Sequence, residues 1–141
     1  MPFSQSLLTP VLALIVWSLV VWIWMYATRI PAMRKAGIDP GQAREPDSLD
    51  RLPLKVRQVA YNYNHLMEQP TIFYALAFYS YLAGQQGEVN IALAWAYVAL
   101  RIVHSLIQAT VNVVTVRFAV HVLGTIVLIA LASRDVWALL G

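Results

Sequence analysis

The stretch from Leu7 to Thr28 contains no charged side chain. As an α-helix it would be about 33 Å long, which is enough to cross the hydrocarbon core of a bilayer. It is longer and richer in Trp and Tyr than the core of a signal peptide, and no basic segment precedes it. We therefore predict a transmembrane helix that the mature protein retains.

The rest of the chain shares this apolar character. Hydrophobic residues make up 60% of the sequence and charged residues 12%, whereas soluble domains average about 45–50% and about 25%. Three more apolar segments follow the first, so we expect helices at about residues 4–28, 54–82, 90–110 and 115–139. The predicted fold is all-α: residues 1–141 form a single integral membrane domain, a four-helix bundle.

The connections between these segments predict how the chain is oriented. Residues 29–53 contain prolines, glycines and many charges, which indicates a long irregular loop. The formal net charge of the chain is +3, and the basic excess falls within residues 29–57. A loop of this kind is expected on the cytoplasmic side of the membrane, with both termini on the other side. Because the excess is confined to one loop, we expect no nucleic-acid partner.

Two prolines lie within the predicted helices. Pro10 and Pro70 each lack a backbone donor, so each is expected to kink its helix. The kink at Pro70 would bend the second helix just beyond Glu68.

Polar side chains are few within the four segments, and they follow helical spacing. Ionisable residues inside membrane helices normally face the bundle interior or a water-filled cavity, and they usually find a partner. The polar residues form one stripe on each of the last three helices. The stripes are Arg57, Tyr61, Asn64 and Glu68, with His65 beside them, then Arg101, His104, Ser105 and Gln108, and finally Arg117 and His121. All three fall in the predicted cytoplasmic half, so they can converge in one polar pocket that opens toward the basic loop.

Several kinds of site fit such a pocket. Glu68 with Arg101 or Arg117 would make a buried ion pair that fixes how the helices pack. Glu68 and the histidines would also suit a proton relay. Two or three histidines with one carboxylate can bind zinc or iron. However, three arginines at the same depth would repel a divalent cation, and the chain contains no cysteine, so we expect no metal site.

Three features together resemble a known family. They are the run YNYNHLMEQPTIFYAL in the second helix, the run WAYVALRIVHSLIQ in the third, and Arg117 sixteen residues after Arg101. This pattern is similar to the MAPEG family, the membrane-associated proteins in eicosanoid and glutathione metabolism, and in particular to its bacterial members. The resemblance covers nearly the whole chain. It implies a homotrimer surrounded by lipid in a bacterial inner membrane, with glutathione bound between neighbouring subunits near the cytoplasmic face.

The resemblance also assigns roles to individual residues. Arg117 matches the arginine that holds the glutathione thiolate and is the expected catalytic residue. Glu68, Arg101 and His104 match the family pattern directly. His65 falls where an Asn is expected, and Tyr61 and Asn64 fall at common Arg positions. The implied glutathione-binding residues are Asn64, His65, Glu68, Arg101, His104, Gln108 and His121.

The chemistry of glutathione suits these side chains. It is an anionic tripeptide with one free amine, so a carboxylate such as Glu68 can pair with the amine while arginines clamp its carboxylates. A nearby arginine also stabilises the reactive thiolate. The expected function is a glutathione-dependent transferase or peroxidase that acts on lipophilic electrophiles or hydroperoxides. The alternative is a non-enzymatic membrane scaffold or accessory subunit, in which the polar stripes only fix helix packing.

Overall fold

The computed structural model describes residues 6–42, 44 and 46–141, and these residues contain helices and no β-strand. The predicted all-α fold is therefore confirmed. The predicted start of the first helix at Ser4 lies outside the described residues. The α-helices are α1 (Leu8–Ala36), α2 (Leu54–Leu66), α3 (Gln69–Leu82), α4 (Glu88–Ala109) and α5 (Val114–Leu140).

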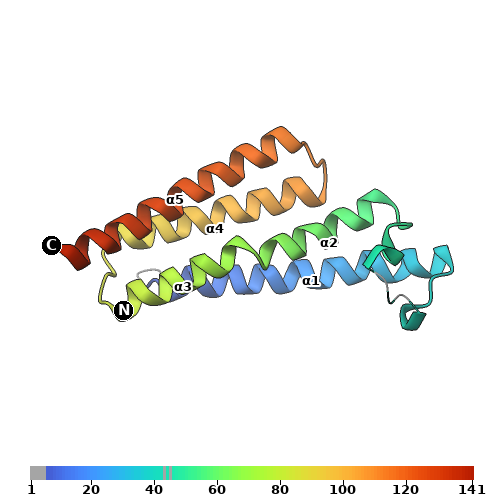
Figure 1. Cartoon of the computed structure of the whole chain (residues 1–141), viewed down its shortest axis with the longest axis horizontal. Coiled ribbons are helices and arrows are strands. Elements are labelled where there is room, and N and C mark those ends of the chain that lie inside the picture. The colour runs from blue at the N-terminus through green and yellow to red at the C-terminus, as the bar shows by residue number, and fades with distance from the viewer. Residues whose placement is uncertain (1–5, 43, 45) are drawn as a thin grey trace.

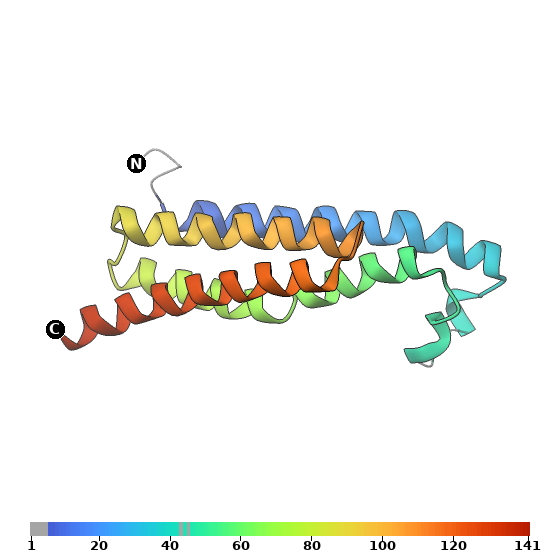
Figure 2. The same ribbon diagram turned by 90° about the horizontal axis from the view of Figure 1, so that it is seen from above.

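The helices form an elongated bundle of four rods. Helices α2 and α3 follow one another alongside α1, and together they make one rod, while α4 and α5 form an antiparallel pair above them (Figure 1). Viewed from above, α4 lies over α1 and α5 lies over α2 and α3 (Figure 2). The C-terminus and the start of α1 lie at one end of the bundle, and the α1–α2 connection lies at the other (Figure 1).

Three of the helices are long and apolar enough to cross a membrane: α1, α4 and α5. The second predicted segment, residues 54–82, is not a single helix. It is divided into α2 and α3, each of which is shorter than a membrane-spanning helix.

Helix α1 continues past the predicted boundary near Thr28. It runs through Pro31 to Ala36 and ends at Gly37, whose φ of 69° is favourable for glycine. The amide N–H groups of Gly37 and Ile38 donate to the carbonyl oxygens of Arg34 and Met33, at 3.3 and 3.0 Å. The predicted 29–53 loop is therefore shorter than expected. It contains two short 3₁₀ turns, Pro40–Gln42 and Pro46–Leu49.

The boundary between α2 and α3 is a break in the backbone rather than a bend. Glu68 has φ −92° and ψ −98°, which no helix accommodates. The N–H groups of Met67 and Glu68 donate back to the carbonyl oxygens of Asn64 and His65, at 3.0 and 3.2 Å. Pro70 then lies in the first turn of α3, where its missing N–H needs no partner. Pro10 likewise lies in the first turn of α1 rather than inside the helix, so the kink predicted there does not arise.

The apolar core positions the polar region of the bundle. Leu14, Leu66 and Phe73 are fully buried in the core. The Phe73 ring stacks on Tyr97 with a centroid distance of 4.7 Å. On the other side, Tyr97 lies close to Gly124, where an added Cβ would be 3.6 Å from the ring. The Tyr97 ring of α4 thus contacts both α3 and α5, one turn before the polar residues of α4.

Candidate functional site

Four of the predicted site residues meet where α2, α4 and α5 approach one another. His65 lies in the last turn of α2, directly before the break. Arg101 and His104 lie one turn apart on α4, and His121 lies on α5. We call these four residues the histidine cluster. It lies in the half of the bundle nearer the α1–α2 connection, as the stripes predict.

The side chains of the histidine cluster are in direct contact. Nη1 of Arg101 is 3.1 Å from Nδ1 of His65. The ring of His65 stacks on that of His104 with centroids 4.8 Å apart, and it meets His121 edge-on at 5.2 Å. The prediction that three polar stripes converge is therefore realised for these four residues.

The cluster holds buried nitrogens that lack hydrogen-bond partners. Arg101 is 2% exposed and His104 is 3% exposed. Within the described part of the chain, Nε and Nη2 of Arg101 and Nδ1 of both His104 and His121 make no hydrogen bond. Buried polar groups are normally bonded, and a buried unpaired charge is costly. The arrangement therefore suits a ligand that brings negative charge and hydrogen-bond acceptors.

The three histidines are also the place where a metal ion would bind. Donor nitrogens of His65, His104 and His121 all lie within 4.8 Å of one another. Two features disfavour a cation, however. The Arg101 guanidinium already contacts His65, and the nearly parallel rings of His65 and His104, 11° apart, do not point at a common centre as tetrahedral ligands would. The geometry fits an anion better than a metal.

Glu68 lies outside the histidine cluster. Its side chain is exposed at the break between α2 and α3, where it makes no capping hydrogen bond to α3. Its carbonyl oxygen accepts a bond from Oγ1 of Thr71 at 2.7 Å. Among the described residues no ion pair joins Glu68 to Arg101 or Arg117, so the buried ion pair considered above is not formed within the single chain.

Arg117 and Gln108 lie at the edge of the polar region. Arg117 is half-buried in the first turn of α5, and its Nη1 donates to Oδ1 of Asn112 at 2.6 Å. Gln108 is buried on α4, and its backbone carbonyl accepts a 3.2 Å bond from Nε2 of Gln58. Its side-chain Oε1 makes no hydrogen bond to another described residue.

Asn64 points away from the histidine cluster. It lines a pocket of about 120 Å³ that Arg29, Arg57 and Tyr61 also line. The described lining residues come from α1, the α1–α2 connection and α2, and none comes from α4 or α5. The predicted single pocket is therefore two separate regions, the histidine cluster and this smaller pocket beside the basic connection.

A hydrogen-bonded chain next to the cluster was missed at the sequence level. Nε2 of Gln69 donates to Oγ1 of Thr125 at 2.8 Å, and the Tyr97 hydroxyl donates to Oε1 of Gln69 at 3.1 Å. These bonds join α3, α4 and α5. The signal was present, because Tyr97 precedes Arg101 by four residues and Thr125 follows His121 by four. Both residues simply extend the polar stripes by one turn.

A buried carboxylate near the other end of the bundle was also missed. Asp135 is 4% exposed on α5. The Ser80 hydroxyl of α3 donates to Oδ2 of Asp135, and Oδ1 makes no hydrogen bond within the described residues. Asp135 and the preceding Arg134 are charged residues inside the fourth predicted helix. Their position there is the feature of the sequence that could have identified them.

Sequence similarity links the chain to a known protein family. The sequence model of the MAPEG family matches residues 7–137. No curated protein and no solved structure matches the chain.

Proposed function

Because this chain belongs to the MAPEG family, and so is an integral membrane protein related to glutathione or eicosanoid metabolism, we propose that it is a glutathione-dependent membrane enzyme. Its reaction is that of a transferase or peroxidase, and its second substrate is a lipophilic electrophile or hydroperoxide. Such a substrate reaches the site laterally from the bilayer, between the helices. The working form is a homotrimer in a bacterial inner membrane, with the 29–53 connection on the cytoplasmic side.

The observation that carries this proposal is the state of Arg101. Its guanidinium is almost fully buried, contacts an imidazole rather than a carboxylate, and keeps two nitrogens without partners among the described residues. A buried charge of this kind needs a counter-ion, and removing it from water is costly without one. A glutathione carboxylate can accept two parallel hydrogen bonds from such a guanidinium. The unpartnered nitrogens of His104 and His121 provide two more contacts beside it.

The other predicted residues take roles that require a second subunit. Glu68 is exposed on the single chain, so it pairs with the glutathione amine where the surface of a neighbouring subunit completes the cleft. Arg117 lies one helical turn before His121 and holds the thiolate. His65 and Gln108 complete the binding surface around the peptide, whereas Asn64 lines the other pocket.

The two reactions balance as follows. In the transferase reaction the thiol loses its proton to water and the sulfur forms a bond to an electrophilic carbon, whose leaving group departs with the bonding electrons. In the peroxidase reaction two glutathione thiols reduce one hydroperoxide to an alcohol and water, and the two thiols become a disulfide. In both cases a cation beside the sulfur stabilises the thiolate that reacts.

Ligand-dependent stability provides the first test. We expect millimolar glutathione to raise the unfolding temperature of the detergent-purified protein, because a ligand that binds only the folded state stabilises it. The gain is about 2.7 kcal/mol at one hundred times the dissociation constant. The Arg117→Ala variant should lose most of this increase. The exposed Arg34 lies at the end of α1, so Arg34→Ala serves as the matched control and should keep it.

A specific observation favours the scaffold alternative. Arg57, the nearest arginine to the family positions now held by Tyr61 and Asn64, is already bonded nearby in the chain. It donates to the carbonyl of Leu52, just before α2, at 2.9 Å and to the Tyr61 hydroxyl at 3.3 Å. If no concentration of glutathione changes the unfolding temperature, the glutathione proposal is wrong and the scaffold alternative is favoured. Conjugation of a model electrophile would then separate an active enzyme from a protein that only binds the thiol.

A further inference from the structure

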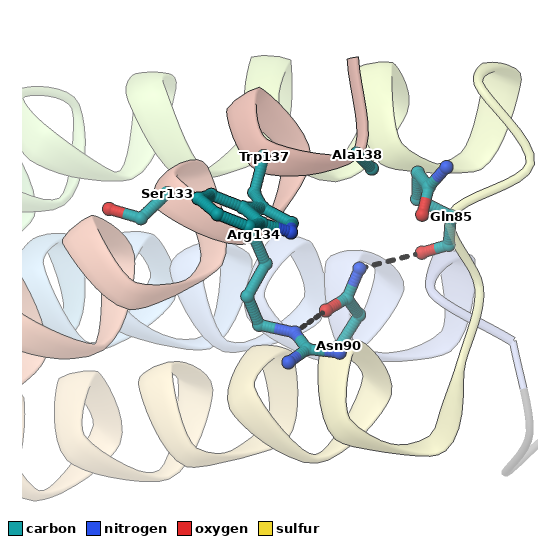
Figure 3. Close-up of a pocket in the computed structure, with 6 residues that line it drawn as sticks. All are labelled: Gln85, Asn90, Ser133, Arg134, Trp137 and Ala138. Carbon is teal, nitrogen blue, oxygen red and sulfur yellow. Dashed lines mark hydrogen bonds between the residues drawn. The ribbon is translucent and has the colours of Figure 1, made fainter. Parts of the chain in front are cut away.

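Another pocket lies at the end of the bundle that carries the C-terminus, away from the histidine cluster (Figure 1). It has a volume of about 500 Å³ and is formed by α5, the first turn of α4 and the α3–α4 connection. We call it the α5 pocket. Figure 3 shows the six residues that line it, which are Gln85, Asn90, Ser133, Arg134, Trp137 and Ala138.

Arg134 is an exposed residue of α5, and one nitrogen of its guanidinium is bonded to a buried amide. Asn90 is 3% exposed, so its amide is set by its surroundings. Its Nδ2 donates to the Gln85 carbonyl at 2.9 Å, and its Oδ1 accepts a 2.6 Å bond from Nε of Arg134 (Figure 3). This pair of bonds leaves both terminal NH₂ groups of Arg134 without another hydrogen bond among the described residues. Two parallel donors on one guanidinium match the oxygens of a phosphate.

The nearby acidic groups do not neutralise Arg134. Asp135 is buried and bonded to Ser80, on the side of α5 that faces α3 rather than α4. Glu88 is exposed and lies two residues before Asn90, so it points from a different face of α4.

The α5 pocket opens onto an exposed apolar stripe of α5. Val122, Ile126 and Ile129 are 38%, 55% and 60% exposed. With Ser133 and Trp137 they follow a spacing of three or four residues, so they form one stripe along α5. Trp137 is 79% exposed in the final turns of this candidate membrane span, which is the depth where tryptophan meets lipid headgroups. An acyl chain lying on this stripe would place its headgroup at the pocket.

We propose that the α5 pocket binds the phosphate group of a membrane phospholipid. Arg134 binds the phosphate oxygens, the buried Asn90 orients Arg134, and the apolar stripe of α5 contacts one acyl chain. The group that the pocket recognises is a phosphate ester. The continuous apolar stripe on α5 indicates that this phosphate belongs to a lipid. This inference does not depend on the proposed glutathione site, because the two sites lie apart in the bundle.

Lipid binding by the full chain tests the proposal. Phosphatidylglycerol is titrated into the detergent-purified protein, and bound lipid is counted by native mass spectrometry. Arg134→Gln should weaken binding by about tenfold or more, the ratio expected for the loss of a charge-assisted hydrogen bond. Arg34→Gln removes the same charge from an exposed position on α1 and should bind like the wild type. Equal affinities for the wild type and Arg134→Gln would overturn the proposal.

Two further measurements locate the lipid and identify its class. Phosphatidylglycerol with brominated acyl chains should quench the emission of Trp137, measured as the difference between the wild type and Trp137→Phe. Absence of quenching would refute the proposed lipid site, and this result does not require Arg134→Gln to fold. Arg134→Lys keeps the charge but loses the Nε bond, so its affinity should lie between those of the other two proteins. Competition by inorganic phosphate at equal concentration would show a free-anion site and would overturn the assignment to a lipid.

Discussion

Replacing Arg101 by methionine is expected to stabilise the ligand-free protein and to abolish its response to glutathione. The methionine fills a similar volume without leaving a buried charge that lacks a carboxylate partner within the chain. Replacing buried charged groups by apolar side chains of similar size is often stabilising, by about 1–4 kcal/mol. Losing two charge-assisted hydrogen bonds to a glutathione carboxylate should weaken binding by about a hundredfold or more.

Thermal unfolding in detergent, with and without glutathione, measures both effects on one sample. Arg34→Met makes the same substitution on the exposed end of α1 and should leave the glutathione response intact. A large loss of stability in Arg101→Met would contradict the expectation. It would mean that the contact of Arg101 with His65 holds the helices together, which is the role that the scaffold alternative assigns to it.

Replacing Phe73 by alanine is expected to cost about 3–5 kcal/mol of unfolding free energy, the usual range when a buried aromatic ring leaves a cavity. Phe73 is 0% exposed, and its ring packs against Tyr97 at 4.7 Å. Tyr97 in turn donates to Gln69 at the start of α3. The cavity should therefore also loosen the contact between α3 and α4 beside the histidine cluster.

Reversible unfolding in mixed micelles of a mild and a denaturing detergent gives the free energy for this comparison. Phe78 lies on the same helix and is 49% exposed, so Phe78→Ala removes the same side chain without opening a cavity in the core. We expect Phe78→Ala to cost much less. If the two variants lose similar free energy, or if Phe73→Ala loses under about 1 kcal/mol, the core described here does not hold the bundle together.

Much of the fold is predictable from the absence of charge along the helices. The segments that form α1, α4 and α5 are apolar over a length that spans a bilayer. Such a segment forms a helix in a membrane because its backbone polar groups must be hydrogen-bonded within the segment. Helix ends were harder to predict. Arg29 and Pro31 indicate the end of α1, but a helix that leaves the bilayer can continue through charged residues and a proline, and α1 does so as far as Ala36.

Helical periodicity alone predicts which polar residues share a helix face, and this was enough to predict part of the site. His65, Arg101, His104 and His121 were assigned to converging stripes, and they do meet. The face that each stripe presents depends on the rotation of its helix. Neighbouring residues differ by about 100° around the axis, so His65 reaches the cluster whereas Asn64 points into another pocket.

The break at Glu68 limited the prediction in a different way. The apolar run on both sides of Glu68 reads as one helix, and Pro70 predicts a bend within it. Whether the backbone bends or breaks depends on how the two carbonyls before it, those of Asn64 and His65, are bonded. That depends on the packing of α2 and α3 against their neighbours, which a single sequence does not reveal.

The division of the second predicted segment into α2 and α3 affects how the chain enters the membrane during synthesis. Helix α2 carries Lys55, Arg57 and two buried amide side chains, Gln58 and Asn62, so it is too polar to partition into lipid by itself. Helix α1 precedes α2 in the chain and packs beside it. The translocon would therefore release α1 into the bilayer first, and α2 would leave the water-filled channel only by docking onto α1.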